Sequence, residues 1–161
     1  MKRFFLTTMC ALMLVSALTW AGPMEVGVAA HQRAEYAAAF SAFRELAEEG
    51  NAAAQFNLGQ MYRQAQGVPR DVVEAARWYH RAAAQDDAQS QYNLGVMYYN
   101  GQGVPRNFVF SHMWLTLSAM SGAENAVRNR AMLVKQMTPE QIAEALRLAR
   151  ACKQHSFKDC D

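Results

Sequence analysis

The chain has few charged residues and no long hydrophobic segment. Of its 161 residues, 19% are charged and 52% are hydrophobic. These proportions are those of ordinary globular proteins, which excludes a disordered or acidic-tail protein. No apolar run reaches 18 residues, so a multi-span membrane protein is also excluded. The length fits one domain.

The charge balance provides no basic excess for binding nucleic acid. Lys2 and Arg3 precede an apolar leader, and no acidic residue precedes Glu25. Without this leader the chain carries 14 basic and 14 acidic side chains. Nucleic-acid recognition needs clustered lysines and arginines that displace counterions from phosphates. We therefore expect no nucleic-acid partner.

Motifs for catalysis are also missing. None of the histidines belongs to a His-Glu-x-x-His string, and the sequence contains no Gly-x-Ser-x-Gly or Ser-x-x-Lys nucleophile motif. They are scattered over four segments, as His31, His80, His112 and His155. The adjacent acids Glu48-Glu49 and Asp86-Asp87 would point to different sides of a helix, not toward one another as in glycoside hydrolysis. We expect a protein that is not an enzyme and has no cofactor.

The first 21 residues have the pattern of a secretory signal peptide. A cationic start precedes an apolar stretch, and the small residues Thr19 and Ala21 favour cleavage after Ala21. The alternative is an uncleaved anchor. About 15 apolar residues rising 1.5 Å each cover only roughly 22 Å, short of the roughly 30 Å hydrocarbon core. We expect a secreted protein, most simply periplasmic, with no membrane span after the leader is removed and with residues 22–32 as a lead-in.

Two cysteines remain without the leader, Cys152 and Cys160. In an oxidising compartment a disulfide between them is the default, and it would fix the C-terminal tail, residues 153–161. The alternative is a metal site. Its ligands would come from the two thiols with His155, Asp159 and Asp161, but their spacing is a weak match to zinc sites.

An internal repeat is the main feature of the sequence. Residues 52–71 match residues 88–107 at 12 of 20 positions without a gap, a shift of 36 residues. A period of this length is typical of solenoids built from helical hairpins, in which each unit is too small to bury its own apolar face. The pattern continues on both sides, from about residue 33 to the C-terminal tail.

Each unit has helical spacing and its own boundary signals. Ala54, Leu58 and Met61 lie on one face of a first helix. We expect Gly59 to allow a close approach to the second helix at Ala82 and Ala83, with Gly95 in the same place one unit later. In the linker, Gly67 and Pro69 end one helix, and Asp71 with Glu74 forms a capping box for the next. Thr138-Pro139 and Gln141 begin the last helix in the same way.

These residues resemble a known family. The string Ala-x-x-x-Leu-Gly-x-Met-Tyr is followed by Gly-Val-Pro-Arg-Asp/Asn, and the first unit continues with Ala75-Ala76-x-Trp78-Tyr79. This pattern is similar to the SEL-one-like repeat, a relative of the tetratricopeptide repeat. The resemblance implies an all-α solenoid of stacked antiparallel hairpins with about seven helices. It covers residues 33–152, with a half unit at 33–50 and units at about 51–86, 87–122 and 123–152. The third unit departs from the pattern, because Arg128 and Arg130 stand where earlier units have aromatic residues and leucines.

The resemblance also implies an adaptor that binds a protein or peptide in its concave groove. In such superhelices the asparagine before the Leu-Gly pair often binds a ligand peptide. The predicted groove residues are Asn57, Gln60, Gln64, Asn93, Asn100, Arg128 and Asn129. The asparagines could instead bond to neighbouring backbone groups. An alternative function is a cell-envelope hydrolase or metal-binding protein, and the sequence leaves the oligomeric state open.

Overall fold

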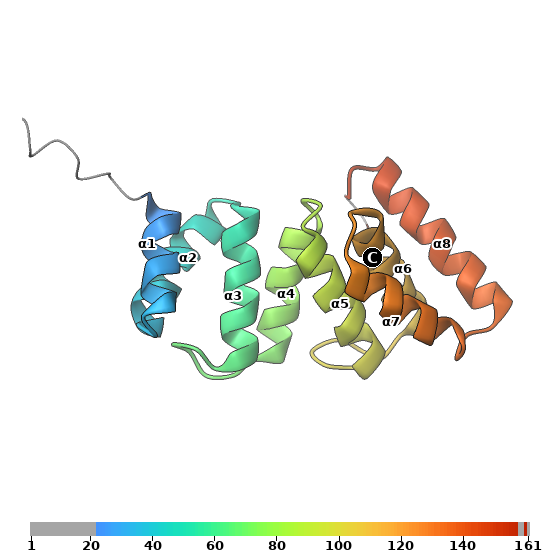
Figure 1. Cartoon of the computed structure of the whole chain (residues 1–161), viewed down its shortest axis with the longest axis horizontal. Helices are drawn as coiled ribbons and strands as arrows, with labels where there is room; N and C mark the ends of the chain where they lie inside the picture. Colours follow the sequence, from blue (N-terminus) through green and yellow to red (C-terminus); the bar gives the residue numbers. More distant parts are fainter. Residues whose placement is uncertain (1–21, 158–159, 161) are drawn as a thin grey trace, which may run out of the picture.

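The structure is a computed structural model, and it describes residues 22–157 and 160. This part of the chain contains α-helices and no strands (Figure 1). The predicted all-α class is confirmed. The eight helices are α1 (Pro23–Gln32), α2 (Tyr36–Glu48), α3 (Ala52–Gln64), α4 (Val72–Ala83), α5 (Ala88–Asn100), α6 (Phe108–Met120), α7 (Glu124–Val134) and α8 (Pro139–Gln154).

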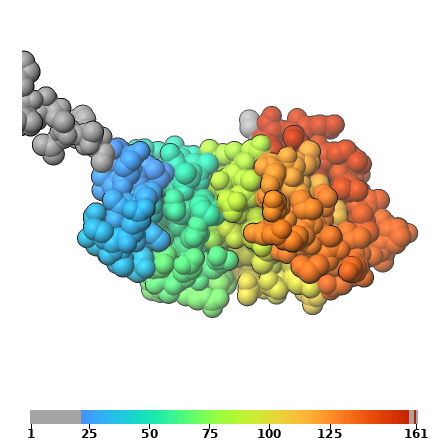
Figure 2. All heavy atoms as spheres, in the orientation of Figure 1, coloured from blue at the N-terminus to red at the C-terminus, as the bar shows by residue number. Residues whose placement is uncertain are grey.

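The helices form a row of hairpins. Helices α1 and α2, α3 and α4, and α5 and α6 pack as pairs, and each pair contacts the next along the row. Figures 1 and 2 show this succession as an elongated body that runs from the N-terminal to the C-terminal helices. The predicted solenoid is therefore confirmed. Among the described residues, no helix has both the length and the apolar character needed to cross a membrane, and the predicted signal peptide, residues 1–21, lies outside them.

One helix more than expected is present at the N-terminal end. Residues 22–32, expected as a lead-in, contain α1, with Pro23 at its first position. A Cβ atom on Gly27 of α1 would lie 2.7 Å from the ring of Phe43 on α2, so the two helices pack closely. The expected half unit is thus a complete hairpin. Its linker, residues 33–35, is shorter than the Gly-Val-Pro loop of the later units. This hairpin therefore does not follow the period of 36 residues.

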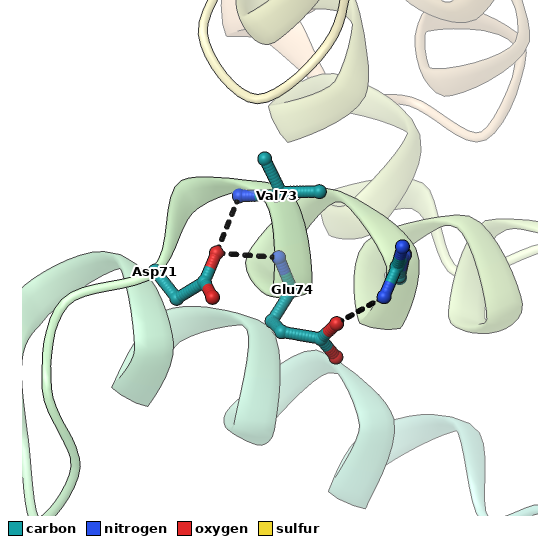
Figure 3. A network of polar contacts seen from close by, with 4 residues as sticks. Asp71, Val73 and Glu74 are labelled. Atoms are coloured by element: carbon teal, nitrogen blue, oxygen red, sulfur yellow. Dashed lines mark hydrogen bonds and ion pairs between the residues drawn. The ribbon is translucent and has the colours of Figure 1, made fainter.

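The linkers carry most of the predicted boundary signals. The Asp71 carboxylate accepts hydrogen bonds from the backbone N–H groups of Val73 at 2.9 Å and Glu74 at 3.0 Å (Figure 3). Asn107 caps α6 in the same way. The predicted capping box at α4 is wrong, because the Glu74 carboxylate pairs with Arg77 and does not return to the Asp71 backbone. At α8 the capping box of Thr138 and Gln141 is present.

The recurring helix glycines face large side chains. Gly59 faces the ring of Tyr79, and Gly95 faces Leu115, each on the second helix of its hairpin. The predicted close approach of the paired helices at Gly59 is confirmed, and the nearest side chain on the second helix is Tyr79. The large residue occupies the space that the missing Cβ leaves, because protein interiors are packed at nearly crystalline density.

The last two helices do not pack against one another as a hairpin. Helix α7 follows the 36-residue register, whereas α8 packs against α6 and makes few contacts with α7. Cys152 and Cys160 form a disulfide with their Cα atoms 4.9 Å apart, within the usual range. Both cysteines belong to the core cluster that contains Tyr79 and Trp114. Helices α7 and α8 both pack against α6 and not against one another.

Candidate functional site

Two side-chain hydrogen bonds join α5 to α7. The Asn129 amide of α7 donates to the Tyr92 hydroxyl of α5 at 3.1 Å. Seven residues further along each partner, the amide of Gln136, just after α7, donates to the Tyr99 hydroxyl at 3.0 Å. Seven residues of helix span roughly 10 Å. The two bonds therefore bound a short slot between these helices, which we call the α5–α7 slot.

A cavity of about 360 Å³ lies in this slot. Its volume is at the lower end of the roughly 300–1,000 Å³ typical of ligand sites. The lining is mainly apolar, with three amides around it. The lining residues are Gly95, Val96, Tyr99, Asn100, Leu115, Asn129, Met132, Leu133 and Gln136. Leu115 and Leu133 are buried and belong to one core cluster, whereas Met132 is 58% exposed.

Local sequence explains why the slot lies here. Tyr92 and Tyr99 of α5 correspond to Phe56 and Arg63 of α3, 36 residues earlier. Neither Phe56 nor Arg63 has a hydroxyl that could accept such a bond. Leu115 packs closely against Gly95, where a Cβ atom would lie 2.7 Å from it, and Met132 on α7 is exposed. The slot is therefore a property of the last units and not of every repeat.

A cation lies close to the slot. The guanidinium carbon of Arg106 lies 4.7 Å from the ring centre of Phe108 and 5.9 Å from that of Tyr99. These two rings are stacked, with their centres 5.6 Å apart. Arg106 and Phe108 also line an adjoining hollow of about 470 Å³ with Asn107 and Gln141. The slot thus combines an apolar interior, amide groups and a stacked arginine.

The structure brings together only part of the predicted groove. Asn100 and Asn129 line the α5–α7 cavity. Arg128 lines a neighbouring hollow of about 240 Å³ with Gln89 and Tyr92, and it pairs with Glu124 at 3.4 Å. Asn57, Gln60, Gln64 and Asn93 are not among the residues that line either of these hollows. The Asn57 amide donates to the Ala53 carbonyl in its own helix, the bond that the backbone alternative anticipated.

Several residues of the slot were missed at the sequence level. Tyr99, Met132 and Gln136 look like core or end-unit residues in the sequence, and Arg106 like a loop residue. The sequence feature that could have indicated the slot is a difference between units. Tyr92 and Tyr99 stand where the preceding unit has Phe56 and Arg63, which cannot form the same hydrogen bonds. A search for what the repeats share cannot find a site that depends on how they differ.

The chemistry of the metal-site alternative is missing from the described residues. No group of three or more histidine, cysteine or acidic side chains could hold a metal ion in that part of the chain. The Cys152 and Cys160 sulfurs are joined to one another, so they are not thiolate ligands. Asp159 and Asp161 lie outside the described residues.

Comparisons with known proteins agree with this architecture. The family model described as Sel1 repeat matches residues 52–87 and 88–122. A crystal structure of a Sel1 repeat protein from Oxalobacter formigenes is 30% identical, with a TM-score of 0.63, and the match covers 68% of this chain and 85% of that one. No curated protein matches the chain.

A second solved structure is a protective antigen present in uropathogenic Escherichia coli strains, which displays an SLR fold. It is 29% identical, with a TM-score of 0.77, over 84% of this chain. The chain spans 31% of the length of that antigen. These findings define a helical-repeat scaffold, a class that commonly serves protein–protein interaction and is generally non-catalytic. The chain belongs to the Sel1 repeat family.

Proposed function

We propose that this protein is an extracytoplasmic binding module that holds a segment of a protein partner in the α5–α7 slot. The observation that carries the proposal is the bounded cavity of about 360 Å³ with an apolar interior and three amides. Apolar surface provides affinity when it is removed from water, and the amides can pair with polar groups of the partner. The scaffold is suited to binding because α5, α6 and α7 bring these groups together around one cavity.

The extracytoplasmic part of the proposal rests on two features. The leader of residues 1–21 has the composition of a signal peptide. The disulfide of Cys152 and Cys160 is of a kind that persists in oxidising compartments. Cell fractionation tests this point directly. Recovery of the protein in the cytoplasmic fraction, with its leader intact and its cysteines reduced, would contradict it.

Site-directed photocrosslinking tests the slot in intact cells. A photoreactive phenylalanine analogue replaces Met132, which is 58% exposed beside the cavity. The matched control replaces Val73, which is 47% exposed on α4 and away from the cavity lining. We expect a discrete adduct from position 132 and none from position 73. No adduct at position 132, or the same adducts at both positions, would refute the slot as the binding site.

A further inference from the structure

Charge is unevenly distributed along the solenoid. Residues 22–87, which include the first two hairpins, carry six basic and nine acidic side chains. Residues 88–138, which build the slot and its connecting loops, carry four basic side chains and one acidic side chain. The basic residues of this stretch are Arg106, Arg128, Arg130 and Lys135. This stretch of the sequence is therefore cationic although the chain without its leader is balanced, and Arg106 is the cation of this stretch that contacts the ring of Tyr99 in the cavity lining.

The cations are largely unpaired. Within the described part of residues 88–138, the one ion pair joins Arg128 to Glu124. Arg106 has no carboxylate partner among the described residues, and its contacts are with the faces of Phe108 and Tyr99. An arginine stacked on a ring keeps its N–H groups at the edge of the guanidinium plane, where they can bind a carboxylate in a bidentate way. The aromatic stack thus orients Arg106 without neutralising it.

The slot has the size for one large side chain. The bonds at Tyr92 and Tyr99 close it at both ends, roughly 10 Å apart, so an extended peptide cannot run along its floor. A single apolar side chain can enter between the bonds, over Leu115 and beside Met132. The rest of the peptide would then cross the slot from outside. Its neighbouring side chains would lie near Arg106 at one end of the cavity.

We infer that the α5–α7 slot selects an acidic peptide segment in which a large apolar side chain is flanked by carboxylates. The apolar side chain fills the cavity, and a flanking carboxylate pairs with Arg106. This inference rests on the proposed function and adds the chemistry of the partner to it. The acidic character follows from Arg106, which contacts Tyr99 of the cavity lining, and the apolar anchor follows from that lining.

Four synthetic peptides, each blocked at both ends, test the inference by NMR titration of the purified protein to millimolar peptide. The first has one tryptophan flanked on each side by two glutamates in a glycine-serine context. The second and third replace the glutamates by glutamines or lysines, and the fourth replaces the tryptophan by serine. We expect the glutamate peptide to bind about fivefold more tightly than the glutamine peptide, the range of an exposed ion pair. The lysine and serine peptides should bind more weakly still.

Three protein variants separate charge selection from the slot itself. Arg106→Gln should remove the preference for the glutamate peptide over the glutamine peptide. Arg70→Gln is the matched control, because Arg70 holds the same position 36 residues earlier but bonds to the Arg63 carbonyl. It should keep the preference. Met132→Trp changes a side chain that is 58% exposed, so the fold should persist while the added ring fills the cavity and weakens all tryptophan peptides.

The outcomes distinguish the two proposals. Equal affinity for the glutamate, glutamine and lysine peptides, all weakened by Met132→Trp, would overturn the acidic preference and leave the slot as a binding site. A glutamate preference that survives Arg106→Gln would overturn the role of Arg106. If no peptide binds, or if Met132→Trp leaves the affinity for every peptide unchanged, both the inference and the proposed binding site in the slot are wrong. Loss of the preference at high salt would support the inference, because exposed ion pairs are screened.

Discussion

Gly59 of α3 lies against the aromatic ring of Tyr79 on α4. A Cβ atom at position 59 would be 2.6 Å from Tyr79 Cε1. Replacing a helical glycine by alanine ordinarily stabilises a helix by about 1 kcal/mol. Here the added methyl group must displace a buried ring, which costs about 1–3 kcal/mol in a packed core. The glycine is therefore retained for packing, and its cost to the helix is offset by the contact.

Gly59→Ala should accordingly lower the free energy of unfolding, measured by urea denaturation. Ala53→Gly is the matched control, because Ala53 lies in the same helix and is exposed. That change should cost only the helix propensity, about 0.5–1 kcal/mol. A stabilised Gly59→Ala protein would contradict the close approach of the two helices.

The hydrogen bond from Asn129 to Tyr92 should couple α7 to the rest of the solenoid. Helix α7 buries only Ala126 and Leu133 along its length, so side-chain bonds matter to its position. In a double-mutant cycle with Tyr92→Phe and Asn129→Ala, we expect a coupling energy of about 0.5–1.5 kcal/mol. The cycle is measured by chemical denaturation. Tyr92→Phe introduces the residue type that Phe56 provides one unit earlier, so the helix itself should tolerate it.

The bond from Gln136 to Tyr99 offers an internal comparison. This pair is exposed to solvent, whereas the pair of Asn129 and Tyr92 is partly buried. Water competes better for exposed groups, so the same cycle with Tyr99→Phe and Gln136→Ala should give a smaller coupling. A larger coupling at the exposed pair, or none at the buried one, would argue against the Asn129 bond as the anchor of α7.

Local signals in the sequence predicted the fold well. Asp71 and Asn107 cap helices because a side-chain oxygen can satisfy the free N–H groups of a first turn, which is a local property. The period of 36 residues predicted the solenoid for the same reason, since each unit repeats one local solution. Helix α1 was not predicted, because the short linker of its hairpin does not follow the 36-residue period. Its glycine, Gly27, carried the signal, but at a spacing of 32 residues from Gly59.

The site was less predictable because it depends on tertiary placement. Asn129 shares a repeat position with Asn57 and Asn93, and only the structure shows that it meets Tyr92. The placement of α8 is also tertiary, because it lies against α6 and makes few contacts with α7. No pattern within α7 indicates this placement.

Protonation of His112 should destabilise the protein in mild acid. His112 is 2% exposed in α6, and its Nδ1 atom lies 3.3 Å from the Thr116 hydroxyl. Burial, and then the positive charge of Arg130, lower its pKa below the ordinary value of 6.5. The unfolded chain therefore binds this proton more tightly than the folded one. The free energy of unfolding should decrease as the pH falls through 6.5 toward the lowered pKa of the folded state.

Urea denaturation between pH 7.5 and 5 checks this expectation. His112→Gln should flatten the pH dependence, whatever its effect on stability at pH 7.5. The carboxylates act in a different window. The pKa values of Glu35 and Glu144 are lowered from 4.5 by Arg33 and Arg147, so any stabilisation they provide is lost only in stronger acid. An unchanged slope in His112→Gln would exclude His112 as the source.

The disulfide of Cys152 and Cys160 should stabilise the folded protein, although the loop that it closes is short. It closes nine residues, and in the chain-entropy model this restricts the unfolded chain by about 2.5 kcal/mol. The bond joins α8 to the tail that follows it, and both cysteines are buried in the cluster that contains Trp114 of α6. Reduction with dithiothreitol should lower the free energy of unfolding by about this amount. Hydrogen exchange should increase first in α8.

The double variant Cys152→Ala/Cys160→Ala is the control, because dithiothreitol should have no further effect on it. Equal stability of the oxidised and reduced protein would mean that packing alone holds α8 in place.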